Sequence, residues 1–179
     1  LPLFLILISL IIRGVSFEYR SKYGDIKWRN RWDNAIIISS FIPSLLWGVA
    51  FANIVKGVPL QRSDAGVIEY VGGFFNLLNP YALLGGGVTL FLFATHGALF
   101  IALKTEGAIR VRANKLAGQL GLVSALLAVL FLSWTNLALT DKSNVMVLSL
   151  VIVLAWLGSL EANRRGREGW AFLASAKTL

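Results

Sequence analysis

The apolar residues of this sequence gather in long blocks that short polar segments separate. The blocks are continuously apolar, whereas the strands of a membrane barrel alternate apolar and polar residues, so helices are predicted. A helix rises about 1.5 Å per residue and needs about 20 residues to cross the hydrocarbon core of a membrane. Four blocks reach that length and two shorter ones lie at the ends. The predicted complete spans are 34–55, 80–103, 116–140 and 143–160, and the partial spans are 1–12 and 170–179.

Composition supports the same fold class. Hydrophobic residues make up 56% of the chain and the mean hydropathy is +0.71, which leaves too little polar surface for a soluble domain. We therefore expect an all-α fold, a polytopic transmembrane helix bundle that forms one membrane domain over residues 1–179. The apolar run 1–12 is too short to span alone, no Met precedes it, and "GWAFLASAKTL" resembles the start of another span. We expect the chain to be a fragment of a longer subunit.

The basic residues are distributed unevenly among the polar segments. Segments 13–33, 104–115 and 161–168 carry thirteen Lys and Arg residues, whereas the alternating segments 56–79 and 141–142 carry three. The positive-inside rule then places the three basic segments in the cytoplasm. The net charge of +8 is explained by topology, and no nucleic-acid partner is predicted.

Two aromatic residues in the first basic segment, Trp28 and Trp32, are four positions apart. One helical turn would put both rings on the same face at the lipid headgroups, where they would anchor the segment. Contact with a partner subunit or a cofactor is the alternative for this segment.

Little in the sequence suggests chemistry of its own. The chain has no Cys and a single histidine, His96, so Cys-ligated metals and a haem held between two of its histidines are excluded, and no metal site is predicted. His96 lies inside a predicted span, where it is either a neutral imidazole bonded to another helix, a member of a proton or quinone path, or a haem ligand. Arg13, Glu18 and Asp33 lie at span ends, where such residues ordinarily snorkel or cap. We predict no catalytic residue.

Two local features predict how the helices begin and pack. Asn79 followed by Pro80 is typical of a helix start, with Asn79 as the cap. Small residues recur every four positions in two successive spans, which predicts that these spans pack closely against each other. The two stripes are Ala94, Ala98 and Ala102 in one span and Ala117, Gly121 and Ala125 in the next.

Several longer stretches resemble a known family. "RGVSFEYRSK" followed by "WRNRWD", "FIPSLLWGVAFANIVKGVPL", "FFNLLNPYALLGG" and "THGALFIALKTEGAIRVRA" are similar, in order and spacing, to subunit II of the cytochrome bd ubiquinol oxidases. The similarity covers most of the chain and weakens over residues 116–160.

The resemblance implies a haem-free subunit II that supports a haem-bearing subunit I in a terminal oxidase of aerobic respiration. In this family the complex oxidises quinol near the outer face and reduces dioxygen to water with protons drawn from the cytoplasm. The enzyme is thus a quinol:oxygen oxidoreductase in which this chain is non-catalytic. Haems b and d belong to the partner, and a structural quinone stays open as a ligand.

Carried over residue by residue, the resemblance implies that Arg13 and Asp33 support the integrity of the haem site. It makes Glu18 a candidate for assisting proton entry and leaves His96 open. It implies a bacterial or archaeal cytoplasmic membrane as the location, with subunit I, membrane lipid and, still open, small single-span accessory subunits as partners. The alternative function is a fragment of a polytopic small-molecule transporter or permease, for which mirrored repeats would be expected.

Overall fold

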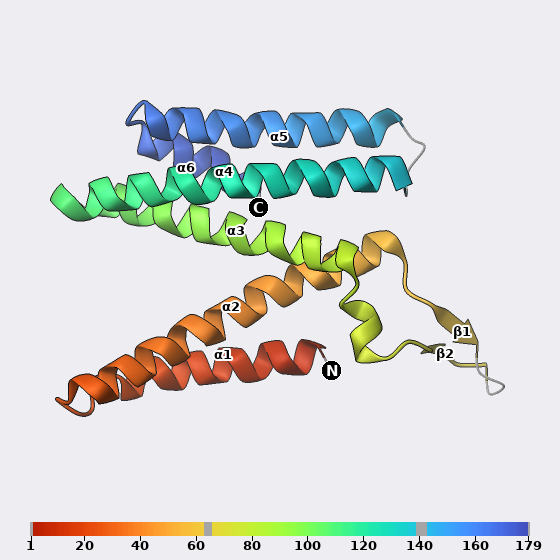
Figure 1. Ribbon diagram of the computed structural model, residues 1–179, viewed down its shortest axis with the longest axis horizontal. Helices are drawn as coiled ribbons and strands as arrows, with labels where there is room; N and C mark the ends of the chain where they lie inside the picture. Colours follow the sequence, from red (N-terminus) through yellow and green to blue (C-terminus); the bar gives the residue numbers. More distant parts are fainter. Residues whose placement is uncertain (1, 63–65, 139–142, 179) are drawn as a thin grey trace. The chain divides into compact units, whose positions relative to one another are not determined.

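The structure, a computed structural model, describes residues 2–62, 66–138 and 143–178. It consists mainly of helices and divides into two compact units, Leu1–Gly86 and Gly87–Leu179, which are described separately (Figure 1).

The first unit is built around a helical hairpin. Helix α1 (Pro2–Tyr19) turns back into α2 (Ile26–Lys56), and the two lie side by side and antiparallel (Figure 1). Beyond α2, strand β1 (Leu60–Arg62) pairs antiparallel with β2 (Ile68–Tyr70), and a short 3-10 helix, η1 (Phe74–Leu77), precedes α3.

The second unit is a bundle of helices. Helix α3 (Pro80–Lys104) enters it from the first unit, and α4 (Gly107–Ala138) lies beside α5 (Ser143–Arg164) (Figure 1). The short α6 (Glu168–Ala176) packs back against α5. A small core joins α3, α4 and α6 through Ala98, Leu99, Ala117 and Ala171.

The stripes of small residues meet only in part. Ala98 and Ala117 share the core as predicted, but Gly121 faces α5, because a Cβ atom added to it would lie 2.2 Å from a methyl carbon of Leu160. The glycine therefore permits close approach of α4 and α5 rather than of α3 and α4.

Helices account for the predicted spans, with different ends. In the described residues four helices are long and apolar enough to cross a membrane, namely α1, α2, α3 and α4. Helix α5 covers the predicted span 143–160, and α6 overlaps the partial span 170–179. Parts of the predicted spans that fall on residues 1, 139–140 and 179 lie outside the described residues, as does segment 141–142.

Much of the three basic segments is helical rather than loop. Helix α1 continues past the predicted end at residue 12 to Tyr19, and α2 begins at Ile26, so only residues 20–25 connect them. Likewise α4 begins at Gly107 and α5 ends at Arg164. The reason is that Arg and Lys end a run of hydropathy without ending a helix, since both are good helix formers.

Hydroxyl groups inside the helices are satisfied locally. Six Ser and Thr side chains within helices, and Thr105 directly after the end of α3, donate a hydrogen bond of 2.6–2.9 Å to the carbonyl oxygen four residues earlier. A donor paired in this way does not need water, which lets it lie in hydrocarbon. These residues are Ser9, Ser16, Ser40, Ser44, Thr95, Thr105 and Thr135.

Candidate functional site

An ion pair ties the two helices of the hairpin together at its tip (residues 19–33). The Arg20 guanidinium donates two hydrogen bonds to the Asp33 carboxylate, through Nε to Oδ1 and through Nη2 to Oδ2 at 3.3 Å. Both side chains remain partly exposed, at 46% and 38%. Asp33, a predicted site residue, is thus held by Arg20, which the sequence did not single out.

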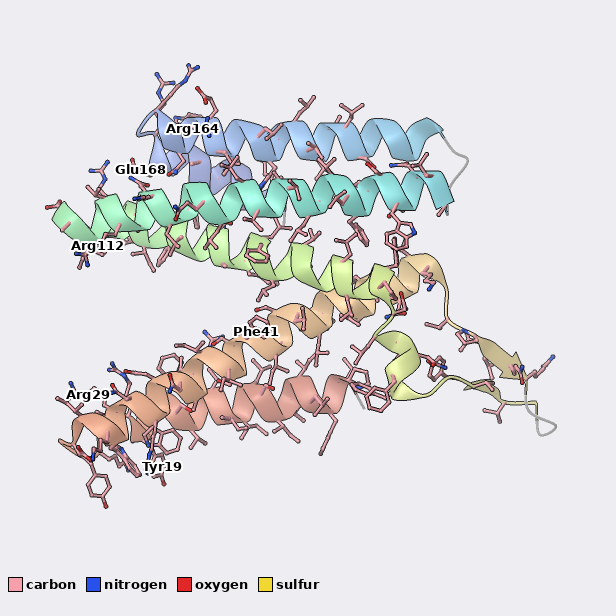
Figure 2. All side chains as sticks on the ribbon, in the orientation of Figure 1. Tyr19, Arg29, Phe41, Arg112, Arg164 and Glu168 are labelled. Carbon is pink, nitrogen blue, oxygen red and sulfur yellow. The ribbon has the colours of Figure 1, made fainter. Side chains whose placement is uncertain are left out.

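Aromatic rings line the same tip. Trp28 donates its indole N–H to the carbonyl oxygen of Tyr19 at 2.8 Å, which satisfies a carbonyl at the end of α1. Ring centroids are 5.6 Å apart for Tyr19 and Trp32, 5.7 Å for Trp32 and Trp28, and 4.9 Å for Trp28 and Tyr23. The contact between Trp28 and Trp32 confirms that the two rings share one face, and Tyr19 and Arg29 mark this end of the hairpin in Figure 2.

Arg13 and Glu18 lie on α1 away from that ion pair. The Arg13 guanidinium carbon is 5.9 Å from the centre of the Phe17 ring, and the Glu18 carboxylate, 73% exposed, is 3.8 Å from the ammonium of Lys22. Within the described residues no hydrogen bond or ion pair joins Arg13 to Glu18 or Asp33. The structure therefore does not bring the three predicted residues of this segment into one cluster.

His96 lies in the second unit and contacts α6. Its Nδ1 is 2.8 Å from Ser175 Oγ, and its ring stacks on Phe172 with centroids 4.4 Å apart. The Ser175 hydroxyl also lies 2.8 Å from the carbonyl oxygen of Phe172, and the imidazole tautomer decides whether Nδ1 donates to Ser175 or accepts from it. The imidazole is thus bonded to another helix, as one of the three interpretations expects. Its roles on a proton or quinone path, or as a haem ligand, stay predictions.

A buried carboxylate that the sequence analysis missed lies where α6 begins. Glu168 Oε1 accepts hydrogen bonds from Arg110 Nε at 3.1 Å, Arg110 Nη2 at 2.8 Å and Asn114 Nδ2 at 3.0 Å. The Glu168 side chain is only 8% exposed, whereas Arg110 is 47% exposed. The bonds from Arg110 and then Asn114 hold the pKa of the Glu168 carboxyl below its usual range, although burial acts in the opposite direction.

The partners of Glu168 are 58 and 54 residues away in the sequence, so spacing gave no signal for this cluster. The only hint was an acidic residue inside a basic segment. Arg112, Arg164 and Glu168 lie at the same end of the second unit, where the charged side chains gather (Figure 2).

A second missed cluster joins α2 to the chain before α3. Asn53 is 5% exposed, and its amide donates to the carbonyl oxygens of Val49 at 2.8 Å and Leu77 at 2.7 Å. Asn79 donates to Asn53 Oδ1 at 3.0 Å and accepts from the backbone N–H of Ala82 at 3.0 Å, which confirms Asn79 as the cap of α3. A lone Asn inside an apolar block was the available signal.

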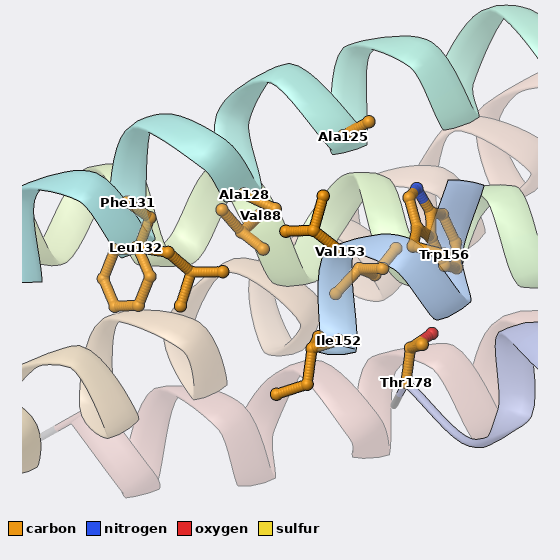
Figure 3. Close-up of a pocket in the computed structure, with 10 residues that line it drawn as sticks. Val88, Ala125, Ala128, Phe131, Leu132, Ile152, Val153, Trp156 and Thr178 are labelled. Carbon is orange, nitrogen blue, oxygen red and sulfur yellow. The ribbon is translucent and has the colours of Figure 1, made fainter. Parts of the chain in front are cut away.

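An apolar cavity of about 180 Å³ lies between α3, α4 and α5 (Figure 3). Figure 3 shows Phe131, Leu132, Val153 and Trp156 around it, and Thr178 is the polar residue at its edge. Such a lining suits a hydrocarbon chain and offers few groups that could orient a polar ligand.

The structure offers few side chains that could ligate a metal ion or a haem iron. The described part of the chain contains no group of three or more His, Cys, Asp and Glu side chains that could hold a metal. His96 is the single histidine of the sequence, so a pair of axial histidines is unavailable.

These features define a multi-pass helical membrane protein: its helices are long and apolar, its hydroxyls bond to their own backbone, and many of its large apolar side chains are exposed. Its polar clusters join helices to one another. The chain belongs to the cytochrome bd terminal oxidase subunit II family, whose model matches residues 1–179.

Curated relatives support this membership. The chain is 42% identical over 120 residues to the cytochrome bd-I ubiquinol oxidase subunit 2 of Escherichia coli K12, which covers 67% of this chain and 32% of that protein. It is 41% identical over 128 residues to a probable cytochrome oxidase subunit 2 of Haemophilus influenzae, 72% of this chain and 34% of that protein. It is also 32% identical over 176 residues to the cytochrome bd ubiquinol oxidase subunit 2 of Bacillus subtilis, 96% of this chain and 51% of that protein.

The chain spans between about a third and a half of the length of these relatives. The resemblance drawn from the sequence motifs is confirmed, and the match does not support the transporter alternative.

Proposed function

We propose that this chain works as part of subunit II of a cytochrome bd-type terminal oxidase and that it supports a haem-bearing subunit I. In that complex, quinol is oxidised, dioxygen is reduced to water, and this chain takes no direct part in the chemistry. The family match over residues 1–179 carries the proposal.

The surface of the helices favours a role in association. Helix α1 buries only Ile6, Ser9 and Ser16, and its other apolar side chains are exposed, with Leu3 at 66% and Phe4 at 61%. Side chains of this kind require lipid or another protein around them. Subunit I is the partner proposed here, and small single-span accessory subunits are further proposed neighbours.

We assign the haems of the complex to subunit I, since this chain offers one histidine and no cysteine. A structural quinone is a further proposal for this subunit. The apolar cavity of about 180 Å³ has the lining that an isoprenoid tail requires. Solvent extraction of the purified complex, followed by chromatography of the extract, tests for the quinone.

The site proposal concerns the first unit. The Arg20–Asp33 pair fixes the hairpin tip, so Asp33 acts as a positioning residue for the surface that subunit I contacts. Arg13 has no ion-pair partner among the described residues and is available to an acidic group of subunit I. Glu18 and His96 remain candidates for a proton path.

For the location we propose a multi-pass protein of a bacterial or archaeal cytoplasmic membrane with segments 13–33, 104–115 and 161–168 on the cytoplasmic side. The supporting observation is the ratio of thirteen basic residues to three. Single cysteines introduced into segment 13–33 should resist a membrane-impermeant maleimide in intact cells, and labelling there would contradict the orientation.

The function is tested with the full-length protein expressed beside its partner. The purified complex should show haem absorption bands and quinol-dependent oxygen uptake, and the absence of both would refute the proposal. Asp33→Asn and Arg13→Gln should lower haem content and oxygen uptake, whereas Arg31→Gln, an exposed arginine of the same segment, should not. Unchanged oxygen uptake in Asp33→Asn and Arg13→Gln would show that these residues do not support the haem site and that this chain acts only as a scaffold.

A further inference from the structure

A polar cavity and an apolar groove adjoin each other in the second unit. The polar cavity, of about 200 Å³, lies where α3 ends and α4 and α6 begin, and the charged residues Lys104, Glu106, Arg110 and Glu168 line it. The groove, of about 360 Å³, is lined by Trp170, Phe172 and Leu173 of α6. Leu103 lines both, so the two adjoin at this residue.

The polar cavity contains two basic and two acidic side chains, and these differ in how far other side chains of the protein already satisfy them. Glu168 is already satisfied by Arg110 and Asn114. Lys104 and Glu106 make no side-chain hydrogen bond or ion pair with the described residues, and both are exposed. Arg110 uses Nε and Nη2 for Glu168, which leaves Nη1 for a ligand. The cavity therefore offers two cationic groups and one carboxylate to a headgroup.

The groove has the complementary character. Trp170 is 69% exposed and Leu173 55% exposed, so the side chains along it require an apolar covering. A single molecule that carries a phosphate, a primary ammonium and an acyl chain would satisfy the cavity and the groove together.

From this adjacency and the charges of the polar cavity we propose that the second unit binds one phospholipid with a zwitterionic, ammonium-bearing headgroup of the phosphatidylethanolamine class. Lys104 and Arg110 bind the phosphate, Glu106 accepts hydrogen bonds from the ammonium, and an acyl chain lies along Leu103, Trp170 and Leu173. A phosphatidylglycerol headgroup lacks the cation for Glu106, and phosphatidylcholine lacks the N–H donors. The site therefore selects among lipids by headgroup chemistry.

The test uses the full-length protein in its complex, placed in phosphatidylcholine vesicles that contain a small fraction of phosphatidylethanolamine with a photoreactive acyl chain. After irradiation, mass spectrometry should find the label on peptides that contain residues 103 and 169–173. Lys104→Gln should lower labelling about fivefold, as expected for one basic contact near a membrane surface. Lys115→Gln removes an exposed basic residue of α4 that lines neither cavity, and it should leave labelling unchanged.

Two further arms separate the parts of the proposal. Glu106→Gln should abolish the preference for phosphatidylethanolamine over phosphatidylglycerol while leaving phosphatidylglycerol labelling intact. Glycerophosphoethanolamine, the headgroup without acyl chains, should fail to displace the lipid at millimolar concentration.

The proposal would be overturned if photoreactive phosphatidylethanolamine, phosphatidylglycerol and phosphatidylcholine label the protein equally. It would also be overturned if Lys104→Gln and Lys115→Gln have equal effects, or if the free headgroup displaces the lipid. So would an absence of label at these peptides, which is the outcome if another protein segment fills the groove. The readout is lipid labelling rather than oxidase activity, so the result is independent of the proposed function.

Discussion

Replacing Arg110 by methionine would leave the Glu168 carboxylate buried with Asn114 as its remaining side-chain donor. Hydrogen bonds to charged groups contribute about 1.5–3 kcal/mol, and breaking a fully buried ion pair costs about 3–5 kcal/mol. Arg110 is 47% exposed, so water already weakens the pair, and we expect Arg110→Met to lower the free energy of unfolding by about 2 kcal/mol.

A double-mutant cycle isolates the contact from other effects of the substitution. Glu168→Gln keeps the bond from Asn114 and should cost about 1 kcal/mol. The double variant should cost about 1 kcal/mol less than the sum of the two single variants, because the uncompensated charge is then absent. Arg112→Met, on the same helix and without an ion pair in the described residues, is the control and should change stability by less than about 0.5 kcal/mol.

The measurement is thermal unfolding of the purified full-length protein in detergent, followed by tryptophan fluorescence. A loss of about 2 kcal/mol corresponds to a fall in Tm of about 4–8 °C for a chain of 150–250 residues, and to a fall of about 2–4 °C for the longer full-length protein. Additive effects in the cycle, or a loss for Arg112→Met equal to that for Arg110→Met, would show that the buried contact does not stabilise the unit.

Three other measurements follow from the same contacts. The pKa of the Glu168 carboxyl is lower in the folded protein than in the unfolded chain, so ionised Glu168 stabilises the fold fully well above about pH 4.3, and this stabilisation is lost as the pH falls through the pKa of the folded protein. Glu168→Gln should flatten this part of a curve of stability against pH. Gly121→Val should lower Tm, because the new side chain meets α5, whereas Gly118→Val, with open space around it, should change Tm little. Asn53→Leu removes hydrogen bonds to Leu77 and to the cap residue of α3, and amide hydrogen exchange at residues 74–80 should become faster; unchanged exchange would contradict this role.

The sequence predicted the helices and one helix cap well, and it predicted contacts between residues far apart in the chain much less well. Apolar blocks predicted the helices, and Asn79 before Pro80 predicted a cap that the structure contains, because both signals are local in the chain. Hydropathy misplaced the end of α1, since it measures affinity for lipid, and the helix continues through Arg13 to Tyr19.

Contacts between distant residues could not be predicted in the same way. The family resemblance drew attention to Arg13 and Asp33, yet Asp33 pairs with Arg20, a choice that depends on how α1 and α2 lie beside each other. Glu168 and Arg110 are 58 residues apart, and nothing in their neighbourhoods marks them as partners. Only the three-dimensional arrangement shows that an arginine of segment 104–115 pairs with the glutamate at the end of segment 161–168.

The serine and threonine hydroxyls bonded to their own helices carry a last implication. Each of these helices supplies both the hydroxyl donor and the carbonyl acceptor. It could therefore pack against a different neighbouring helix without leaving an unpaired polar atom in the hydrocarbon of the membrane. The specificity of assembly must then come from the few groups that bond to another helix, such as Asn53, Glu168 and Trp156, whose indole N–H donates to the carbonyl oxygen of Gly121 on α4 at 3.2 Å. Substituting those residues, rather than the more numerous hydroxyl-bearing residues, would change which helices pack against each other.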